Sequence, residues 1–146
     1  MSTGDIVRWW REYFEELLNP TNTYSMEETE PRGLGMGGSI SGAEVAEVVK
    51  QLRGGGAPGI DEIRPGYLKA LDVVGLSWLT RLCNIAWTSG EVPLEWQTGV
   101  VVPVFKKGDQ RVCSSYRGIT LLSLPSKVYS RVLEKRVRSI VEPQIE

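Results

Sequence analysis

Histidine is absent from the 146-residue sequence. Its absence excludes Ser-His-Asp and Cys-His catalysis, histidine-ligated metal sites and an imidazole-based pH switch. Cysteine is scarce: Cys83 and Cys113 are too few for a four-thiolate zinc site or a disulfide framework, so we predict two ordinary thiols in a reducing environment. Long apolar runs are also missing. No segment approaches the ~20 apolar residues of a membrane-spanning helix, and no signal peptide is evident.

The composition that remains is globular, with 41% hydrophobic and 24% charged residues. Its charge is unevenly distributed. Residues 1–80 contain 7 basic and 12 acidic residues, whereas residues 81–146 contain 10 and 6, so the net charge of −1 hides two opposite halves. A pI near 5.6 argues against a free-standing nucleic-acid-binding protein. The basic stretch from Lys106 to Arg138 nevertheless favours a local anionic partner, with a solvated basic face as the alternative.

Apolar residues recur at helical spacing from Ile6 to Leu18, which predicts an amphipathic helix. Asn19-Pro20 ends this helix, because the residue before proline is disfavoured in the helical conformation. The helix carries so many aromatic side chains that it needs a surface on which to dock. From Thr21 to Ser39 the sequence is rich in Thr, Glu, Gly and Pro and has no periodicity, which predicts a linker.

Three helices are predicted between Ser41 and Gly90. The first begins at Ser41, because Glu44 three residues later completes a capping box, and it ends before the glycines of residues 54–59. Pro65 suits the first turn of the second helix, which Gly75 is expected to interrupt. The third is expected from Leu76 to Trp87, with Gly90 as its C-terminal cap. The residues expected on the three buried faces are Val45, Val48, Val49 and Leu52; Leu68, Leu71 and Val74; and Leu79, Leu82, Cys83 and Ala86.

After Trp96 the pattern changes to that of β-strands. Residues 100–105 are mostly β-branched and nearly all apolar, which predicts a strand covered on both faces. Because Pro103 cannot donate to a ladder, the strand is expected to lie at an edge or to be broken there. A second strand is expected from Arg117 to Leu122, and a helix from Pro125 to about Val141. Four cations of that helix fall opposite its apolar side: Lys127, Arg131, Lys135 and Arg138.

Arg136 projects into the apolar side of the last predicted helix, where it either extends to solvent or meets a carboxylate or phosphate. The elements together predict an α+β fold that is mostly helical with one β-hairpin. Two strands make a poor sheet, and residues 142–146 contain no stop signal, so we expect the chain to be a piece of something longer.

Two segments are candidates for phosphate binding. Residues 54–61, GGGAPGID, could direct backbone N–H groups toward an anion, but they lack the lysine and hydroxyl residue that end a Walker motif. A loop between helices, with Asp61 capping a turn, is the favoured interpretation. The second candidate is the hairpin, which would bring Lys106 or Lys107 near Arg117 and so pair a compact charge with a guanidinium fork. An exposed lysine-rich tip that protects an edge strand is its alternative.

The run VVVPVFKKGDQRVCSSYRGITLLSLPSKVYSRVLEKRV, residues 100–137, resembles the start of reverse transcriptases from non-LTR (LINE-type) retrotransposons. Three earlier segments agree with this resemblance: WWREYFEELLNP at 9–20, GGGAPGIDEIRPGYLKAL at 54–71 and LCNIAWTSGEVPLEWQTG at 82–99. Together the segments cover most of the chain. The resemblance implies that residues 1–40 are a helix and linker leading into the polymerase and that residues 41–146 are a partial reverse transcriptase domain.

The resemblance further implies the fingers subdomain of a right-hand polymerase, with an RNA template, a DNA primer, dNTP and the palm and thumb as partners, and no membrane. It assigns the grip on the nucleotide triphosphate to Lys106, with Lys107 as the near alternative, and to Arg117. Residues 54–61 match a segment that lies along the template. The basic helix after Pro125 lies nearby, and its candidate template-binding residues are Lys127, Arg131 and Arg138. Gly56 departs from the family, where lysine is common, and this puts a template contact there in doubt.

Polymerases of this family hold two metal ions on aspartates of the palm, and Mg²⁺ is expected in the full-length parent. The chain has four aspartates, Asp5, Asp61, Asp72 and Asp109, and none lies in either metal-binding motif of the family. We therefore expect no bound cofactor and no catalytic residue in this chain, and no activity from it alone. A non-catalytic module that binds RNA or a partner, or a non-functional transposon remnant, is the alternative function. The resemblance also implies an intracellular location in the nucleus or cytoplasm.

Overall fold

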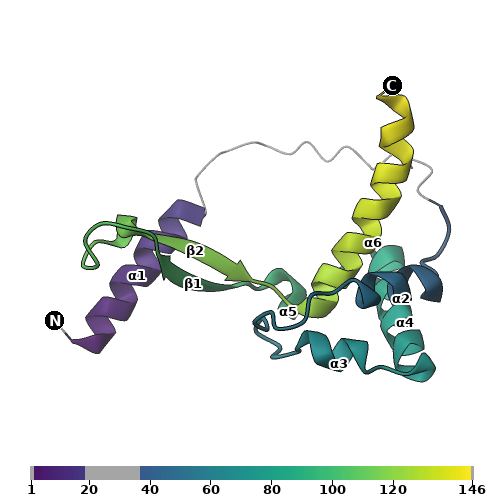
Figure 1. Cartoon of the computed structure of the whole chain (residues 1–146), viewed down its shortest axis with the longest axis horizontal. Helices are drawn as coiled ribbons and strands as arrows, with labels where there is room; N and C mark the ends of the chain where they lie inside the picture. The colour runs from purple at the N-terminus through teal and green to yellow at the C-terminus, as the bar shows by residue number, and fades with distance from the viewer. Residues whose placement is uncertain (1, 19–36, 146) are drawn as a thin grey trace. The chain divides into compact units, whose positions relative to one another are not determined.

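The computed structural model describes residues 2–18 and 37–145. It confirms the α+β class, since these residues are mostly helical and contain one two-stranded antiparallel hairpin (Figure 1). In chain order the elements are α1 (Thr3–Leu18), α2 (Gly42–Lys50), α3 (Pro65–Lys69), α4 (Val73–Ser89), α5 (Leu94–Gln97), β1 (Val100–Phe105), η1 (Cys113–Ser115), β2 (Tyr116–Leu121), α6 (Leu124–Val141) and η2 (Glu142–Gln144). The predicted linker lies mostly outside the described residues.

Helix α1 and the hairpin form one compact unit. Figure 1 shows α1 lying along the hairpin, which is the surface that its aromatic residues were expected to need. Phe14 is buried there, and the ring of Trp10 packs edge-on against Tyr116 with their centroids 4.7 Å apart. Gly118 permits this packing, because a Cβ at that position would lie 2.8 Å from the Phe14 ring. The absence of a side chain at Gly118 therefore allows α1 to pack closely against β2.

The remaining described residues, 37–100 and 121–145, form a second unit with the larger core. Helix α2 packs against both α4 and α6, and its Val45, Val48 and Val49 are buried as the sequence predicted. The capping box is present: the Ser41 side chain accepts from the Glu44 N–H, and Glu44 accepts from the Ser41 N–H. The other core residues of this unit are Ile40, Leu68, Leu79, Cys83, Ala86, Trp96, Leu124, Val128 and Val132.

Arg136 of α6 meets a carboxylate inside the second unit. Its Nε donates to Glu44 Oε1 at 2.7 Å and its Nη2 donates to Oε2 at 2.9 Å, so the pair is bidentate. The same guanidinium donates to the carbonyls of Gly38 and Ser39 and stacks over the Trp87 ring at 5.5 Å. The cation on the apolar side of α6 therefore anchors the entry to α2, which decides between the alternatives that the sequence left open.

The segment between Pro65 and Gly90 differs from the prediction. Helix α3 ends at Lys69, and α4 begins at Val73 and continues through Gly75, because the Asp72 side chain caps α4 by accepting from the Gly75 N–H at 2.8 Å. The predictions that Gly75 breaks a helix and that Val74 and Leu82 are buried are therefore wrong. Val74 is 63% exposed and Leu82 is 36% exposed. Glycine suits this position, because the Cβ of any other residue would lie 2.7 Å from the Leu71 side chain.

The prediction that β1 is covered on both faces is also wrong. Val102 remains 38% exposed, and its cross-strand neighbour Ile119 is 39% exposed. Continuous apolar residues are typical of strands between two layers, but within this unit only one face of the hairpin carries a helix. The edge position expected from Pro103 is confirmed, because β1 pairs on one side only, with β2.

Candidate nucleic-acid interface

A groove of about 680 Å³ in the second unit brings the glycine-rich loop together with the first half of α6. Its floor is apolar and includes Val48, Leu52 and Leu124. Its charged lining residues are Arg53, Lys127 and Arg131, and no carboxylate lines it among the residues that the structure describes. A positively charged groove with an apolar floor matches the chemistry of a nucleic-acid backbone, in which phosphates alternate with sugars.

The glycine-rich loop is held against the start of α6 by a close backbone approach. A Cβ on Gly59 would lie 2.5 Å from the Leu122 carbonyl carbon and 2.6 Å from the Ser123 nitrogen, so only glycine fits. Ser123 is fully buried and caps α6. Asp61 accepts a hydrogen bond from the Ile63 N–H at 3.2 Å, which confirms that it caps a turn. The groove wall made by Gly56 and Ala57 is thus fixed to the same helix that supplies two of the cations.

The three predicted template-binding residues of α6 do not share one environment. Lys127 and Arg131 line the groove, and no ion pair engages either of them among residues 2–18 and 37–145. Arg138 lies outside the groove lining and pairs with Glu134 of α6 and with Glu142, the first residue of η2. Its guanidinium is therefore already neutralised, whereas the charges of Lys127 and Arg131 remain available to an anion.

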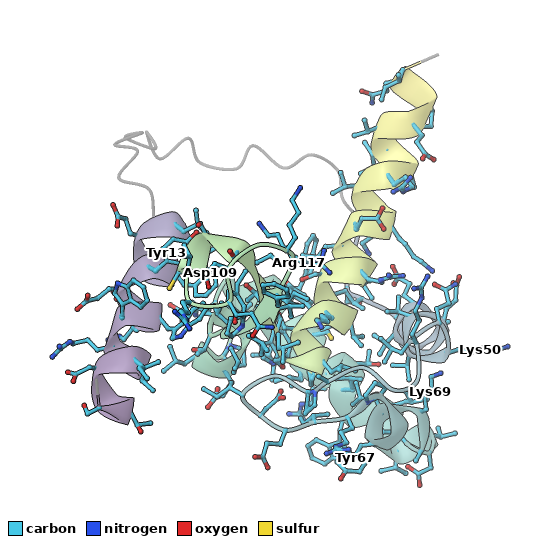
Figure 2. The ribbon with its side chains drawn as sticks, turned by 60° about the vertical axis from the view of Figure 1, so that its left-hand side comes forward. Tyr13, Lys50, Tyr67, Lys69, Asp109 and Arg117 are labelled. Atoms are coloured by element: carbon cyan, nitrogen blue, oxygen red, sulfur yellow. The ribbon has the colours of Figure 1, made fainter. Side chains whose placement is uncertain are left out.

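The hairpin carries the second set of predicted residues, and its register places them. The Lys106 N–H donates to the Ser115 carbonyl at 2.9 Å, which sets Phe105 opposite Tyr116, and these two rings are in contact with centroids 5.4 Å apart. Side chains alternate between the two faces of a strand. Because Tyr116 and Gly118 face α1, Arg117 (labelled in Figure 2) lies on the other face of the hairpin. Lys106 lies opposite Ser115 in this register and is therefore on the same face as Arg117.

Lys107 is placed differently from Lys106. It lies beyond the end of β1, in the turn that Gly108 forms with a positive φ of 99°, where strand alternation no longer sets the direction of a side chain. All three cations are exposed. The hairpin register therefore places Lys106 on the same face as Arg117, whereas Lys107 lies in the turn beyond the paired strands.

Sequence comparison adds an independent finding. The chain is 36% identical over 102 residues to a protein named "Probable RNA-directed DNA polymerase from transposon X-element" of Drosophila melanogaster, covering 69% of this chain. A polymerase of the same description from transposon BS of that species is 31% identical over 99 residues, or 67% of this chain. The chain is homologous to the RNA-directed DNA polymerases of non-LTR retrotransposons. A 115 kDa protein of the retrotransposable element R1DM, also from Drosophila melanogaster, extends this similarity to 94% of the chain at 29% identity.

The chain spans between 11% and 14% of the length of these three relatives. No protein-family model matches it. Polymerases of this kind generally use Mg²⁺, but the described residues contain no group of three or more acidic or thiol side chains that could hold a metal ion, so no metal-dependent step is assigned to them. None of the described helices is long and apolar enough to cross a membrane.

Part of the groove was not predicted from the sequence. Arg53, Ser126 and Ser130 were not among the predicted site residues, yet all three line the groove. The signal for the serines was available, because positions 126, 127, 130 and 131 share one helix face with the predicted cations. Arg53 gave no such signal, because it follows the end of α2 and its direction depends on the loop.

Proposed function

We propose that this chain is a template- and nucleotide-binding segment of a retrotransposon RNA-directed DNA polymerase. The observation that carries the proposal is the groove between the glycine-rich loop and α6, where Arg53, Lys127 and Arg131 gather without a carboxylate among the described lining residues. Homology to transposon polymerases supports an RNA template as the occupant. Lys106 and Arg117 on the open face of the hairpin would bind the triphosphate of the incoming dNTP.

In this proposal the groove binds the backbone of the template and does not select its sequence. Arginine and lysine contact phosphate oxygens, and the hydroxyls of Ser126 and Ser130 are suited to further phosphate or sugar contacts. The described groove lining contains no aromatic side chain on which a base could stack. Such a site suits a polymerase, which must copy any template sequence.

The groove is tested by measuring the affinity of the purified chain for single-stranded RNA. Fluorescence anisotropy gives this affinity over a range of salt concentrations. Three phosphate contacts predict a slope of log K against log salt of about −2, since each contact to a single strand contributes about −0.7. Lys127→Gln and Arg131→Gln should each reduce this slope by about 0.7 and weaken all RNA sequences equally. Lys50→Gln is the matched control, because Lys50 is exposed at the end of α2 and lies outside the groove lining (Figure 2). Equal effects of the control and the groove variants would contradict the assignment.

A further inference from the structure

A pair of residues, a serine followed by a cation, occurs twice along the groove side of α6. Ser126 and Lys127 line the groove, and Ser130 and Arg131 line it four residues later. Four residues of α-helix advance about 6 Å, which is close to the distance between successive phosphates of a nucleic-acid strand. The two cations therefore form one row along the helix, and the two serines, which we call the serine row, form a second row beside it. Each of these turns of α6 offers one charge and one hydroxyl to one nucleotide.

The repeat ends after two turns. At the next turn Lys135 pairs with Glu47, their Nζ and Oε1 atoms 2.9 Å apart, so its charge is already neutralised. The position that continues the serine row is occupied by Glu134, whose carboxylate pairs with Arg138. A carboxylate repels a further phosphate at that position. The two rows therefore fit two successive nucleotides of a strand.

Ser126 is suited to accept a hydrogen bond from a ligand in the groove. Its Oγ donates to the Trp96 carbonyl at 3.4 Å, which commits its hydrogen and leaves its lone pairs as acceptors. Phosphate oxygens are acceptors as well, so they do not complement this hydroxyl. The 2′-hydroxyl of ribose is an O–H donor on every nucleotide of RNA, and DNA lacks it. The chemistry of Ser126 therefore matches the sugar of RNA rather than the phosphate.

We propose that the serine row binds the 2′-hydroxyls of two successive ribonucleotides and so selects RNA over DNA. Lys127 and Arg131 bind the phosphates of these nucleotides. Ser126 accepts the hydrogen of one 2′-hydroxyl, and Ser130, which is exposed, donates to or accepts from the other. This inference rests on the proposed function, because it needs a strand in the groove. It goes beyond that function, since phosphate contacts do not distinguish RNA from DNA.

The test is the affinity of the purified chain for three strands of equal length: oligouridine, oligodeoxyuridine and 2′-fluoro-oligouridine. The fluoro strand keeps the sugar pucker of RNA but has no 2′ O–H, so it separates the donor from the shape of the strand. Fluorescence anisotropy should show that the wild-type chain binds oligouridine roughly tenfold or more tightly than either other strand, since each neutral hydrogen bond contributes about fivefold in affinity.

Variants of the two rows should have opposite effects. Ser126→Ala and Ser130→Ala should each reduce the preference for RNA about fivefold and leave the salt slope unchanged, because a hydroxyl displaces no counterion. Lys127→Gln should instead reduce the salt slope and weaken the binding of all three strands alike. Ser139→Ala is the matched control, because the Ser139 hydroxyl also donates to a backbone carbonyl, that of Arg136, but lies outside the groove lining. It should change neither quantity.

The outcomes separate this inference from the proposed function. Equal affinity of the wild-type chain for RNA and DNA would overturn the inference, whereas salt slopes that fall in Lys127→Gln and Arg131→Gln would still support the groove. Binding of the fluoro strand as tightly as RNA would also overturn it, because strand shape would then explain the preference. Serine variants that weaken all three strands alike would reduce the serine row to a structural role. Salt slopes that do not change in the two cation variants would contradict the groove itself, and the inference would fall with it.

Discussion

Arg136 is the residue whose role the sequence left most open. Among the described residues, its hydrogen bonds reach the carboxylate of Glu44 and the carbonyls of Gly38 and Ser39, so one side chain links α6 to the residues that begin α2. Its side chain is only 14% exposed, and an unpaired charge at that depth would destabilise the fold, so the folded state needs the Glu44 carboxylate beside it. Periodicity alone could place the cation on the apolar side of α6, but it could not supply a partner 92 residues away in sequence.

The Glu44–Arg136 pair predicts a specific dependence of stability on pH. Hydrogen bonds from Arg136 lower the pKa of Glu44 from its ordinary 4.5 to about 2, so the folded state keeps this carboxylate ionised where the unfolded state protonates it. The contribution is therefore fully present above about pH 5 and is lost as the pH falls toward 2. Glu44 is 35% exposed, and allowing for solvent screening we expect about 1–2 kcal/mol.

The measurement is urea unfolding of the wild type and of Glu44→Gln between pH 7 and pH 2. The variant should be less stable at pH 7, and the difference between the two proteins should shrink as the pH approaches 2. Glu47→Gln is a suitable control, because Glu47 pairs with Lys135 at a more exposed site. A difference that stays constant over the whole range would contradict a role for the charge of Glu44.

At the scale of elements, the register of the hairpin decides which residues share a face. Lys106 and Lys107 are adjacent in sequence, and the sequence could not distinguish them. The hydrogen bond between Lys106 and Ser115 fixes the pairing of the strands, and the contact of Tyr116 with α1 fixes which face is open. Lys106 then shares a face with Arg117, whereas Lys107 lies in the turn beyond the paired strands.

This register predicts different effects for the two lysines in a polymerase that contains this segment. Lys106→Ala and Arg117→Ala should raise the KM for all four dNTPs alike and lower kcat/KM by about ten- to a hundredfold, because charge-assisted hydrogen bonds to phosphate contribute about 1.5–3 kcal/mol each. Arg117→Lys should recover little, since lysine lacks the two-pronged geometry of the guanidinium. Lys107→Ala should remain within a few-fold of wild type. Primer extension kinetics provide the measurement, and a larger effect at Lys107 than at Lys106 would refute the assignment.

The sequence predicted the elements whose ends carry local chemistry. Ser41 and Pro65 mark the starts of α2 and α3, Gly90 caps α4 with a positive φ of 72°, and all three were recognised. The error at Gly75 arose because glycine is unfavourable inside a helix, whereas the third position of α4 is stabilised by Asp72. The exposure of Val102 was missed because apolar content predicts burial only where a second layer is present.

The candidate groove was predictable only in part, because the sequence indicates local structure and not the tertiary contacts between elements. Lys127 and Arg131 lie four residues apart on one helix, so their common direction follows from helical geometry. Arg53 joins them only because Gly59 brings the loop against the Leu122–Ser123 backbone, and this tertiary approach leaves no periodic signal. The sequence does not show that Arg138 is neutralised, because this depends on the side chains of both Glu134 and Glu142 turning toward it.

At the scale of the whole molecule, the chain divides into two units with unequal cores. The second unit buries apolar residues from α2, α3, α4, α5 and α6 in one cluster. In the first unit, Phe14 and Cys113 are the apolar side chains that are buried among the described residues. Buried apolar surface is the main source of stability, so the units should differ in the free energy of opening.

Hydrogen exchange monitored by mass spectrometry should reveal this difference. Amides of α2, of the buried part of α4 and of the first half of α6 should exchange most slowly. Amides of α1 and of β1 and β2 should exchange faster, because their unit opens at a lower free energy. Equal protection in both units would indicate that they unfold as one cooperative body.

The two native thiols offer a consequence of the same division. Cys83 is fully buried in the second unit, and burial raises its pKa to about 11, while Cys113 is 4% exposed in the first unit. A thiol must become accessible and ionise before it reacts with an alkylating reagent. The alkylation rate of each cysteine therefore reports the opening of its own unit. A single alkylation time course of the wild-type chain, analysed peptide by peptide, measures both opening rates.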